Sequence, residues 1–342
     1  MRSPRLGVGI KRTVFLACAG GLASVAMACS AGGAPSQPTQ APAAAGAAAP
    51  QAASTPRLKI AMITHQAPGD TFWDIVRKGA DAAAAKDNVE VVYSNDPEAA
   101  KQSTLVQNAI DSKVNGIAIT LSKPDALAGA VQNATNAKIP VVAFNSGLDA
   151  WSQTGAMMYF GQDENLAGQT AGQRLTQEGL KHVLCVVQEQ GHVALEARCA
   201  GVKSGLSSGQ TENLYVTGTN MPSVRSTIAA KLQSDSSIDS VITLGAPFAL
   251  TAVTSAKDAS SKAKIYTFDT NSELVNAIKS GDVQWAIDQQ PYLQGYLAVD
   301  SLWLYLNNGD IIGGGKTVLT GPSFITKDNI EAIAQYASKG TR

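Results

Sequence analysis

Short apolar runs and longer amphipathic segments alternate along most of the chain. From Leu58 onward, each run has the length and β-branched content of a buried strand, and each longer segment could form a crossover helix. This alternation predicts an α/β protein whose parallel sheets carry helices on both faces. We expect strands at 58–64, 89–94, 116–120, 140–145 and 156–160, and in a second series at 182–188, 213–219, 240–245 and 264–269. The intervening helices are expected at 71–86, 97–113, 124–138, 164–178, 194–206, 222–234 and 247–260.

The pattern continues beyond the second series. A further apolar run, 283–287, ends shortly before Pro291, and a helix is predicted at 291–308. Polar side chains follow two of these runs directly, Asp269 after the first and Gln289 after the second. Because open α/β sheets bind ligands at the carboxyl ends of their strands, we expect both side chains in a ligand site.

The N-terminal segment has the features of an export signal. In residues 1–28, basic residues precede an uncharged apolar stretch that ends in small residues suitable for cleavage. Cys29 follows at the position where a lipoprotein is cleaved and acylated; ordinary signal-peptidase cleavage before the same cysteine is the alternative. Residues 29–56 are rich in Ala and Pro and carry no charge, which predicts a disordered tether. We therefore expect an exported protein, lipid-anchored to the outer face of the cytoplasmic membrane.

Two cysteines remain in the predicted mature domain. Cys185 lies in a predicted strand and Cys199 in the helix that follows it. The two could meet within one strand–helix unit, and export to an oxidising compartment favours a disulfide between them. Two buried free thiols are the alternative.

Charge and motif content limit the class of function. The chain has 27 basic and 27 acidic residues, so no electrostatic attraction to nucleic acid is expected. It contains three histidines, and it lacks an HExxH motif, a Walker A sequence and an EF-hand loop. We therefore predict no enzyme activity, no catalytic residues, no metal and no cofactor. An exported α/β hydrolase is the alternative from another class.

The order strand, Phe-Asp, helix, strand, Gln-x-Pro in residues 264–296 resembles the sugar-binding branch of the type I periplasmic binding proteins. The likeness extends from residue 57 to about 325. It implies two lobes, each a doubly wound parallel sheet, joined by a three-strand hinge. The implied N-terminal lobe is 57–161 plus 290–319, and the implied C-terminal lobe is 162–289 plus 320–342.

The same resemblance assigns ligand contacts to the strand ends. In the family, a polar residue and two adjacent aromatics at the first junction contact the sugar, although one aromatic could instead face the core. The implied set is Asp70, Phe72, Trp73, Asn145, Arg198, Asp269 and Gln289, with Ser146 as a weaker candidate. Glu189 and His192 are weaker candidates from their position alone, because the loop that carries them precedes the arginine's helix and could reach the cleft. The arginine would offer a fork of donors, and the aspartate after the strand would accept sugar hydroxyls.

The resulting hypothesis is a monomeric solute-binding protein of an ABC importer. It would close on a hexose, a pentose or a related polyol and deliver it to a membrane permease driven by an ATPase. Asn145, Ser146 and Gly245 stand where sugar binders of this family carry stronger polar residues, which leaves the ligand open. A nucleoside- or autoinducer-binding lipoprotein of the same fold is therefore an alternative. A sugar-responsive repressor would need a helix-turn-helix where the export signal stands.

Overall fold

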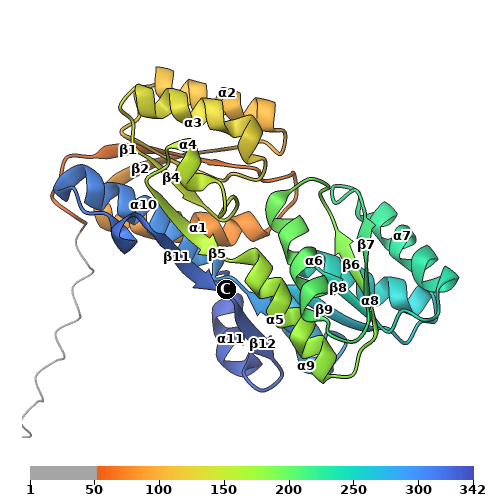
Figure 1. Ribbon diagram of the computed structural model, residues 1–342. Helices are drawn as coiled ribbons and strands as arrows, with labels where there is room; N and C mark the ends of the chain where they lie inside the picture. The colour runs from red at the N-terminus through yellow and green to blue at the C-terminus, as the bar shows by residue number, and fades with distance from the viewer. Residues whose placement is uncertain (1–51) are drawn as a thin grey trace, which may run out of the picture. The chain divides into compact units, whose positions relative to one another are not determined.

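The computed structural model describes residues 52–342, which form two α/β lobes (Figure 1). The predicted signal peptide, Cys29 and most of the predicted tether lie outside the described residues. Two residues at the end of that tether contact the first lobe: Ala53 N–H donates to Lys86 O (2.8 Å), and Thr55 Oγ1 accepts a hydrogen bond from Trp303 Nε1 (3.1 Å). Across 52–342, no helix combines the length and apolar character that a membrane span requires.

The first lobe contains a six-stranded parallel sheet with the strand order β11-β5-β4-β3-β1-β2. Helices α2 and α3 cover one face, and α1 and α10 cover the other (Figure 1). Burial on both faces explains why these strands are almost continuously apolar. The strands are β1 (Leu58–Thr64), β2 (Val89–Asn95), β3 (Gly116–Ile119), β4 (Val141–Phe144), β5 (Met158–Gln162) and β11 (Thr317–Gly321). The helices are α1 (Phe72–Asp87), α2 (Ala99–Asp111), α3 (Pro124–Asn136), α4 (Trp151–Thr154) and α10 (Pro291–Asn308), with a 3-10 turn at Ile312–Gly315.

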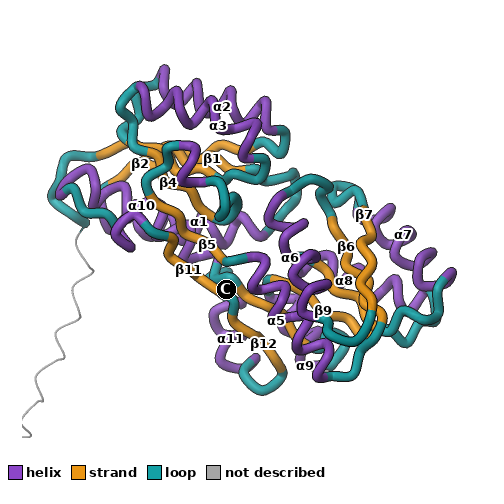
Figure 2. Tube along the Cα trace, in the orientation of Figure 1, coloured by secondary structure: helices purple, strands orange, loops and turns teal. Residues whose placement is uncertain are grey.

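The second lobe repeats this architecture of strands covered by helices (Figure 2). Its strand order is β12-β10-β9-β8-β6-β7. Its strands are parallel except β12, which runs antiparallel to β10. Helices α5 and α6 pack on one face, and α7, α8, α9 and α11 pack on the other. The strands are β6 (His182–Val187), β7 (Gln210–Tyr215), β8 (Ser240–Thr243), β9 (Lys264–Phe268), β10 (Trp285–Asp288) and β12 (Ser323–Thr326). The helices are α5 (Glu164–Gln177), α6 (Val193–Gly205), α7 (Met221–Ser234), α8 (Ala246–Asp258), α9 (Ser272–Ser280) and α11 (Ile330–Ala337).

The predicted pair of doubly wound, mainly parallel sheets is confirmed. The chain passes from one sheet to the other after β5, after β10 and between β11 and β12. One strand differs from its predicted range: β7 was expected at 213–219 and occupies Gln210–Tyr215. It pairs in register with β6 from His182–Gln210 to Val187–Tyr215, so it ends level with its partner. Residues 216–219 therefore form a loop at the carboxyl edge of the sheet.

Helices α5 and α6 approach each other closely through glycines. A Cβ atom on Gly168 would lie 2.1 Å from Arg198 O, and one on Gly201 would lie 2.3 Å from Asn165 O. The disulfide between Cys185 and Cys199 connects the same helix α6 to strand β6. Both features hold α6 in one position relative to α5 and the sheet.

Replacing Gly168 by alanine should therefore destabilise the protein. The added methyl group would overlap backbone, and overpacking of this kind costs about 1–3 kcal/mol. Gly129 is the matched control, because it lies in helix α3 with no atom within 4 Å of the added Cβ. Gly129→Ala should stabilise by about 0.5–1 kcal/mol. Urea unfolding of both variants measures the difference, and equal stabilities would contradict the close packing of α5 and α6.

Candidate functional site

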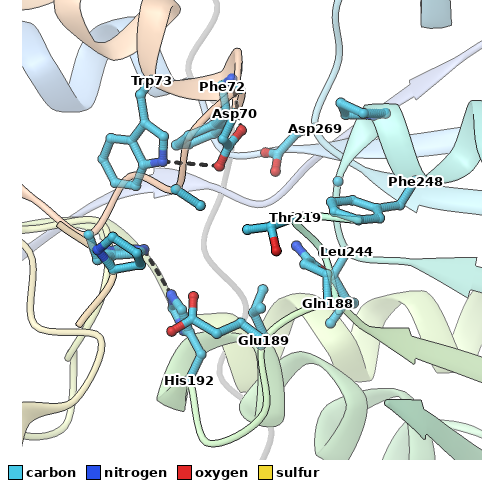
Figure 3. A pocket seen from close by; sticks show the side chains of 18 of the residues that line it. Asp70, Phe72, Trp73, Gln188, Glu189, His192, Thr219, Leu244, Phe248 and Asp269 are labelled. Carbon is cyan, nitrogen blue, oxygen red and sulfur yellow. Dashed lines mark hydrogen bonds between the residues drawn. The ribbon is translucent and has the colours of Figure 1, made fainter. Parts of the chain in front are cut away.

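A cavity of about 920 Å³ lies between the two lobes, at the carboxyl ends of the strands. Figure 3 shows side chains from both lobes pointing into it. The structure brings every predicted ligand-binding residue to this cavity. These are Asp70, Phe72, Trp73, Asn145, Ser146, Glu189, His192, Arg198, Asp269 and Gln289.

Two of these residues occupy matching places in the two lobes. Asn145 follows β4 and Asp269 follows β9, and each of these strands is third from the hinge-side edge of its sheet. Both residues have a left-handed backbone, with φ of 65° and 62°. Their N–H groups donate to the neighbouring strand, to Phe160 O (2.8 Å) and Ile287 O (2.7 Å) respectively. Asn and Asp tolerate this conformation better than most residues, which explains why short polar side chains stand at these turns.

The Gln289 amide connects these two strand ends. Its Oε1 accepts a hydrogen bond from Asn145 Nδ2 (3.2 Å), and its Nε2 donates to Asp269 Oδ1 (2.9 Å). Asn145 Nδ2 also donates to Gln294 Oε1 (3.1 Å), and Ser146 Oγ donates to Asn145 Oδ1 (2.9 Å). Both amide hydrogens of Asn145 are thus engaged, and it can offer a ligand only an acceptor. Ser146, which is fully buried, orients Asn145.

Arg198 is held by a buried acidic partner that the sequence analysis missed. Its Nε and Nη2 donate to the two carboxylate oxygens of Glu164 (2.6 and 3.0 Å), and its Nη1 donates to Leu244 O (3.0 Å). The Nη1 atom also lies 3.7 Å from Asp269 Oδ2. Three of the five guanidinium N–H groups are therefore used, which leaves two for a ligand at the cavity wall. The local signal for Glu164 is its place directly after Asp163, the N-cap of α5.

The first strand–helix junction supplies a carboxylate and one accessible ring. Asp70 accepts hydrogen bonds from the Phe72 backbone N–H and from Trp73 Nε1, both at 3.1 Å. Trp73 is 2% exposed and belongs to the core under α1 and α10, whereas Phe72 is only partly buried. Of the two adjacent aromatics, Trp73 is thus the one that faces the core. Phe72 is left as the ring that can cover an apolar ligand face.

Burial controls the protonation of the two aspartates. Loss of solvent raises the pKa of Asp269 to about 7, against the opposing effects of Arg198 and the Gln289 hydrogen bond. Burial likewise raises the pKa of Asp70 to about 6, although its two hydrogen bonds oppose the shift. Groups that donate hydrogen bonds to these carboxylates would stabilise their ionised forms. The site therefore suits a neutral ligand rich in hydroxyl donors.

A pair of histidines joins the lobes beside the cavity. Nε2 of His192, at the start of α6, lies 2.8 Å from Nε2 of His65, which follows β1. His192 Nδ1 accepts the Ala194 N–H (3.2 Å), so its proton is on Nε2 and is donated to His65. His65 Nδ1 in turn donates to Thr120 Oγ1 (2.7 Å). This chain of hydrogen bonds requires both rings to be neutral, and sequence reasoning did not identify His65 or Thr120 as part of it.

Two further contacts cross between the lobes at this place. Val193 N–H donates to Ser122 O (3.1 Å), and Lys123 Nζ lies 3.1 Å from Glu189 Oε1. Glu189 and His192 therefore line the cavity but are already paired with residues of the other lobe. Their contacts indicate a role in holding the lobes together.

Both interlobe histidines should stay neutral well below the pH at which a free imidazole ionises. Burial lowers the pKa of His192 to about 3 and that of His65 well below 6.5, and the proximity of the two rings lowers the pKa of His65 further. The contribution of the pair to closure is thus present above about pH 6.5 and lost as the pH falls below it. The NMR chemical shifts of the ring C–H groups between pH 8 and pH 5 report the protonation of each ring. The signals are assigned by comparison with His65→Gln and His192→Gln variants. The urea-unfolded chain serves as the control, and a folded-state midpoint near 6.5 for either ring would contradict the account.

The sequence itself supplies an independent finding. The profile of the periplasmic binding protein domain family matches residues 60–310. The chain belongs to this family. The resemblance inferred from residues 264–296 is thereby confirmed, and members of the family are solute-binding proteins of transport systems.

Individual relatives agree with this assignment. A carbohydrate transporter of Acidothermus cellulolyticus 11B, solved in complex with myo-inositol, is 61% identical; the alignment covers 84% of this chain and 100% of that one, with a TM-score of 0.83. The xylose/arabinose-binding protein XylF of Sulfolobus acidocaldarius is 27% identical over 294 residues, which are 81% of this chain and 73% of XylF. An ABC transporter solute-binding protein of Agrobacterium vitis with bound D-fucose is 26% identical, covering 81% of this chain and 98% of that one, with a TM-score of 0.73.

Proposed function

We propose that this periplasmic binding protein captures a single-ring polyol between its lobes and delivers it to an ABC importer. The candidate ligands are a cyclitol, with myo-inositol first, and a hexose or pentose. The relative that is 61% identical was solved with myo-inositol, and the others are associated with xylose, arabinose and fucose.

The observation that carries this proposal is the pairing of Arg198 with Asp269 at the cavity wall. Two N–H groups of the guanidinium remain for a ligand, and Asp269 Oδ2 lies 3.7 Å from Nη1. A hydroxyl group both donates and accepts, so neighbouring hydroxyls of one ring can satisfy the arginine and the aspartate together. The partly buried ring of Phe72 would cover the apolar face of the same ligand.

The mode of action that we infer is closure of the lobes on the ligand. The ligand would stabilise the closed form because it contacts Asp70 from one lobe and Arg198 and Asp269 from the other. The closed form would then dock on a permease powered by an ATPase. Acylation of Cys29 and a tether over 29–56 would hold the protein at the outer face of the cytoplasmic membrane.

Replacing Asp269 with asparagine should weaken ligand binding strongly. The change keeps the shape of the side chain but removes the charge, and a hydrogen bond to a charged group contributes about 1.5–3 kcal/mol. The dissociation constant for the ligand should therefore rise roughly 10- to 150-fold. Isothermal titration calorimetry with myo-inositol, D-xylose, L-arabinose and D-fucose measures the effect.

Asp81→Asn is the matched control, because Asp81 is exposed on helix α1, outside the cavity. This variant should bind as the wild type does. The proposal would be wrong if none of the four ligands bound the wild type, or if Asp269→Asn left the affinity of the bound ligand unchanged.

Binding should also release protons near neutral pH. The pKa of Asp269 is about 7, so the side chain is about half protonated at pH 7, and hydroxyl donors favour its ionised form. Up to about half a proton should leave per ligand bound at pH 7, and affinity should fall as the pH drops below 7. Calorimetry in phosphate and in Tris measures the released protons from the difference in apparent heat. Asp269→Asn should abolish most of that difference in heat. An unchanged difference would show that the released protons do not come from Asp269.

A further inference from the structure

The cavity extends well beyond the Arg198–Asp269 pair, toward the outer strands of the second lobe. The strands β9, β8, β6 and β7 are consecutive neighbours in this sheet. Since adjacent strands lie about 4.8 Å apart, the loop after β7 stands roughly 14 Å from Asp269. A six-membered ring with bonds of about 1.5 Å spans only roughly 6 Å with its hydroxyls. One ring held by Asp269 therefore leaves the outer part of the cavity unfilled.

This outer part contains a polar side chain without a partner. The Oε1 atom of Gln188, which follows β6, is buried and accepts no hydrogen bond from any residue of 52–342. Gln188 also lines the cavity. A buried carbonyl oxygen left unpaired costs about 1–3 kcal/mol, so its position at a cavity wall indicates a ligand that donates to it. The Oγ1 atom of Thr270, a side chain 5% exposed on the same cavity, likewise lacks a partner among these residues.

An aromatic ring stands beside the unpaired glutamine. Phe248, in the first turn of α8, is partly buried and lines the cavity. Its ring lies against two glycines: a Cβ on Gly218 would be 3.2 Å from Phe248 Cζ, and one on Gly245 would be 3.4 Å from Phe248 Cδ2. In Figure 3, Gln188, Thr219 and Phe248 gather on one side of the cavity, and Trp73 and His192 lie on the other. The outer part thus combines an apolar ring face with uncharged polar groups.

The acidic side chains near this region are paired with lysines. Glu98, beyond β2, and Glu189 line the cavity from the two lobes. The side chains of Gln188, Thr219 and Phe248 carry no charge. Lys101 Nζ lies 3.1 Å from Glu98 Oε1, and Lys123 Nζ lies 3.1 Å from Glu189 Oε1, so each pair is neutral overall and the region suits a neutral hydroxylated ring.

We propose that this outer region is a second subsite, which binds a second hydroxylated ring joined to the first by a glycosidic bond. The ligand class is then a glycosylated cyclitol or a disaccharide. Gln188 accepts a hydroxyl of the second ring, and Phe248 packs against its apolar face. The inference rests on the proposed function, because Arg198 and Asp269 must hold the first ring.

Calorimetry on the purified protein tests the subsite with paired ligands. The probes are myo-inositol and the single-ring sugars, compared with a galactosyl-myo-inositol and with disaccharides that contain the sugar bound best. At least one two-ring ligand should bind ten or more times as tightly as its single-ring parent. Phe248→Ala and Gln188→Leu should each remove most of this gain and leave the single-ring affinity within about twofold.

Thr219→Trp provides a test that does not depend on deleting a contact. Thr219 is exposed on the loop after β7 and lines the cavity, so the variant should fold. The tryptophan would fill the outer region, exclude two-ring ligands and spare single-ring ones. Tyr336→Ala, an exposed aromatic on α11, is the control and should change neither affinity.

The outcomes separate this inference from the function on which it rests. If single-ring ligands bind and every two-ring ligand binds no better than its parent, the subsite is wrong and the proposed function stands. The subsite is also wrong if Thr219→Trp weakens both classes equally. If no single-ring or two-ring polyol binds the wild type, the proposed function fails as well.

Discussion

The whole site depends on one buried amide. Gln289 accepts from Asn145 of one lobe and donates to Asp269 of the other, through bonds of 3.2 and 2.9 Å. Buried polar groups need hydrogen-bond partners. Gln289 lies where the chain crosses between the lobes for the second time, and it is a partner of both strand-end side chains. The hydrogen bond from Gln289 Nε2 to Oδ1 therefore fixes the orientation of Asp269, and its second oxygen, Oδ2, faces the cavity.

The two ends of the cavity wall differ in what holds them. Near the hinge, Arg198 is fixed by a bidentate ion pair with Glu164, on a helix whose glycines let it approach α5 closely. Beside the cavity, the lobes meet through His65 and His192, whose contact requires neutral rings. The first arrangement belongs to one lobe and can persist when the lobes separate. The second exists only while they are closed, so it couples the closed state to pH.

Periodicity and strand-end position were enough to predict the sheets, most helices and the residues lining the cavity, because the carboxyl ends of parallel strands meet at one edge. Partners distant in sequence were not predictable in this way. Glu164 lies 34 residues from Arg198, and His65 lies 127 residues from His192. The end of β7 was misplaced because its length is set by pairing with β6. The sequence predicts Asn145 as a ligand contact, but it does not reveal that both of its amide hydrogens are donated to Gln289 and Gln294.

The most direct test of the central claim is thermal melting of the purified protein against a panel of cyclitols, pentoses, hexoses and nucleosides. A ligand that binds only the folded state raises the melting temperature in proportion to the logarithm of its concentration over its dissociation constant. The account predicts a concentration-dependent rise with at least one cyclitol or monosaccharide. A rise with nucleosides alone, or no rise with any polyol, would contradict it.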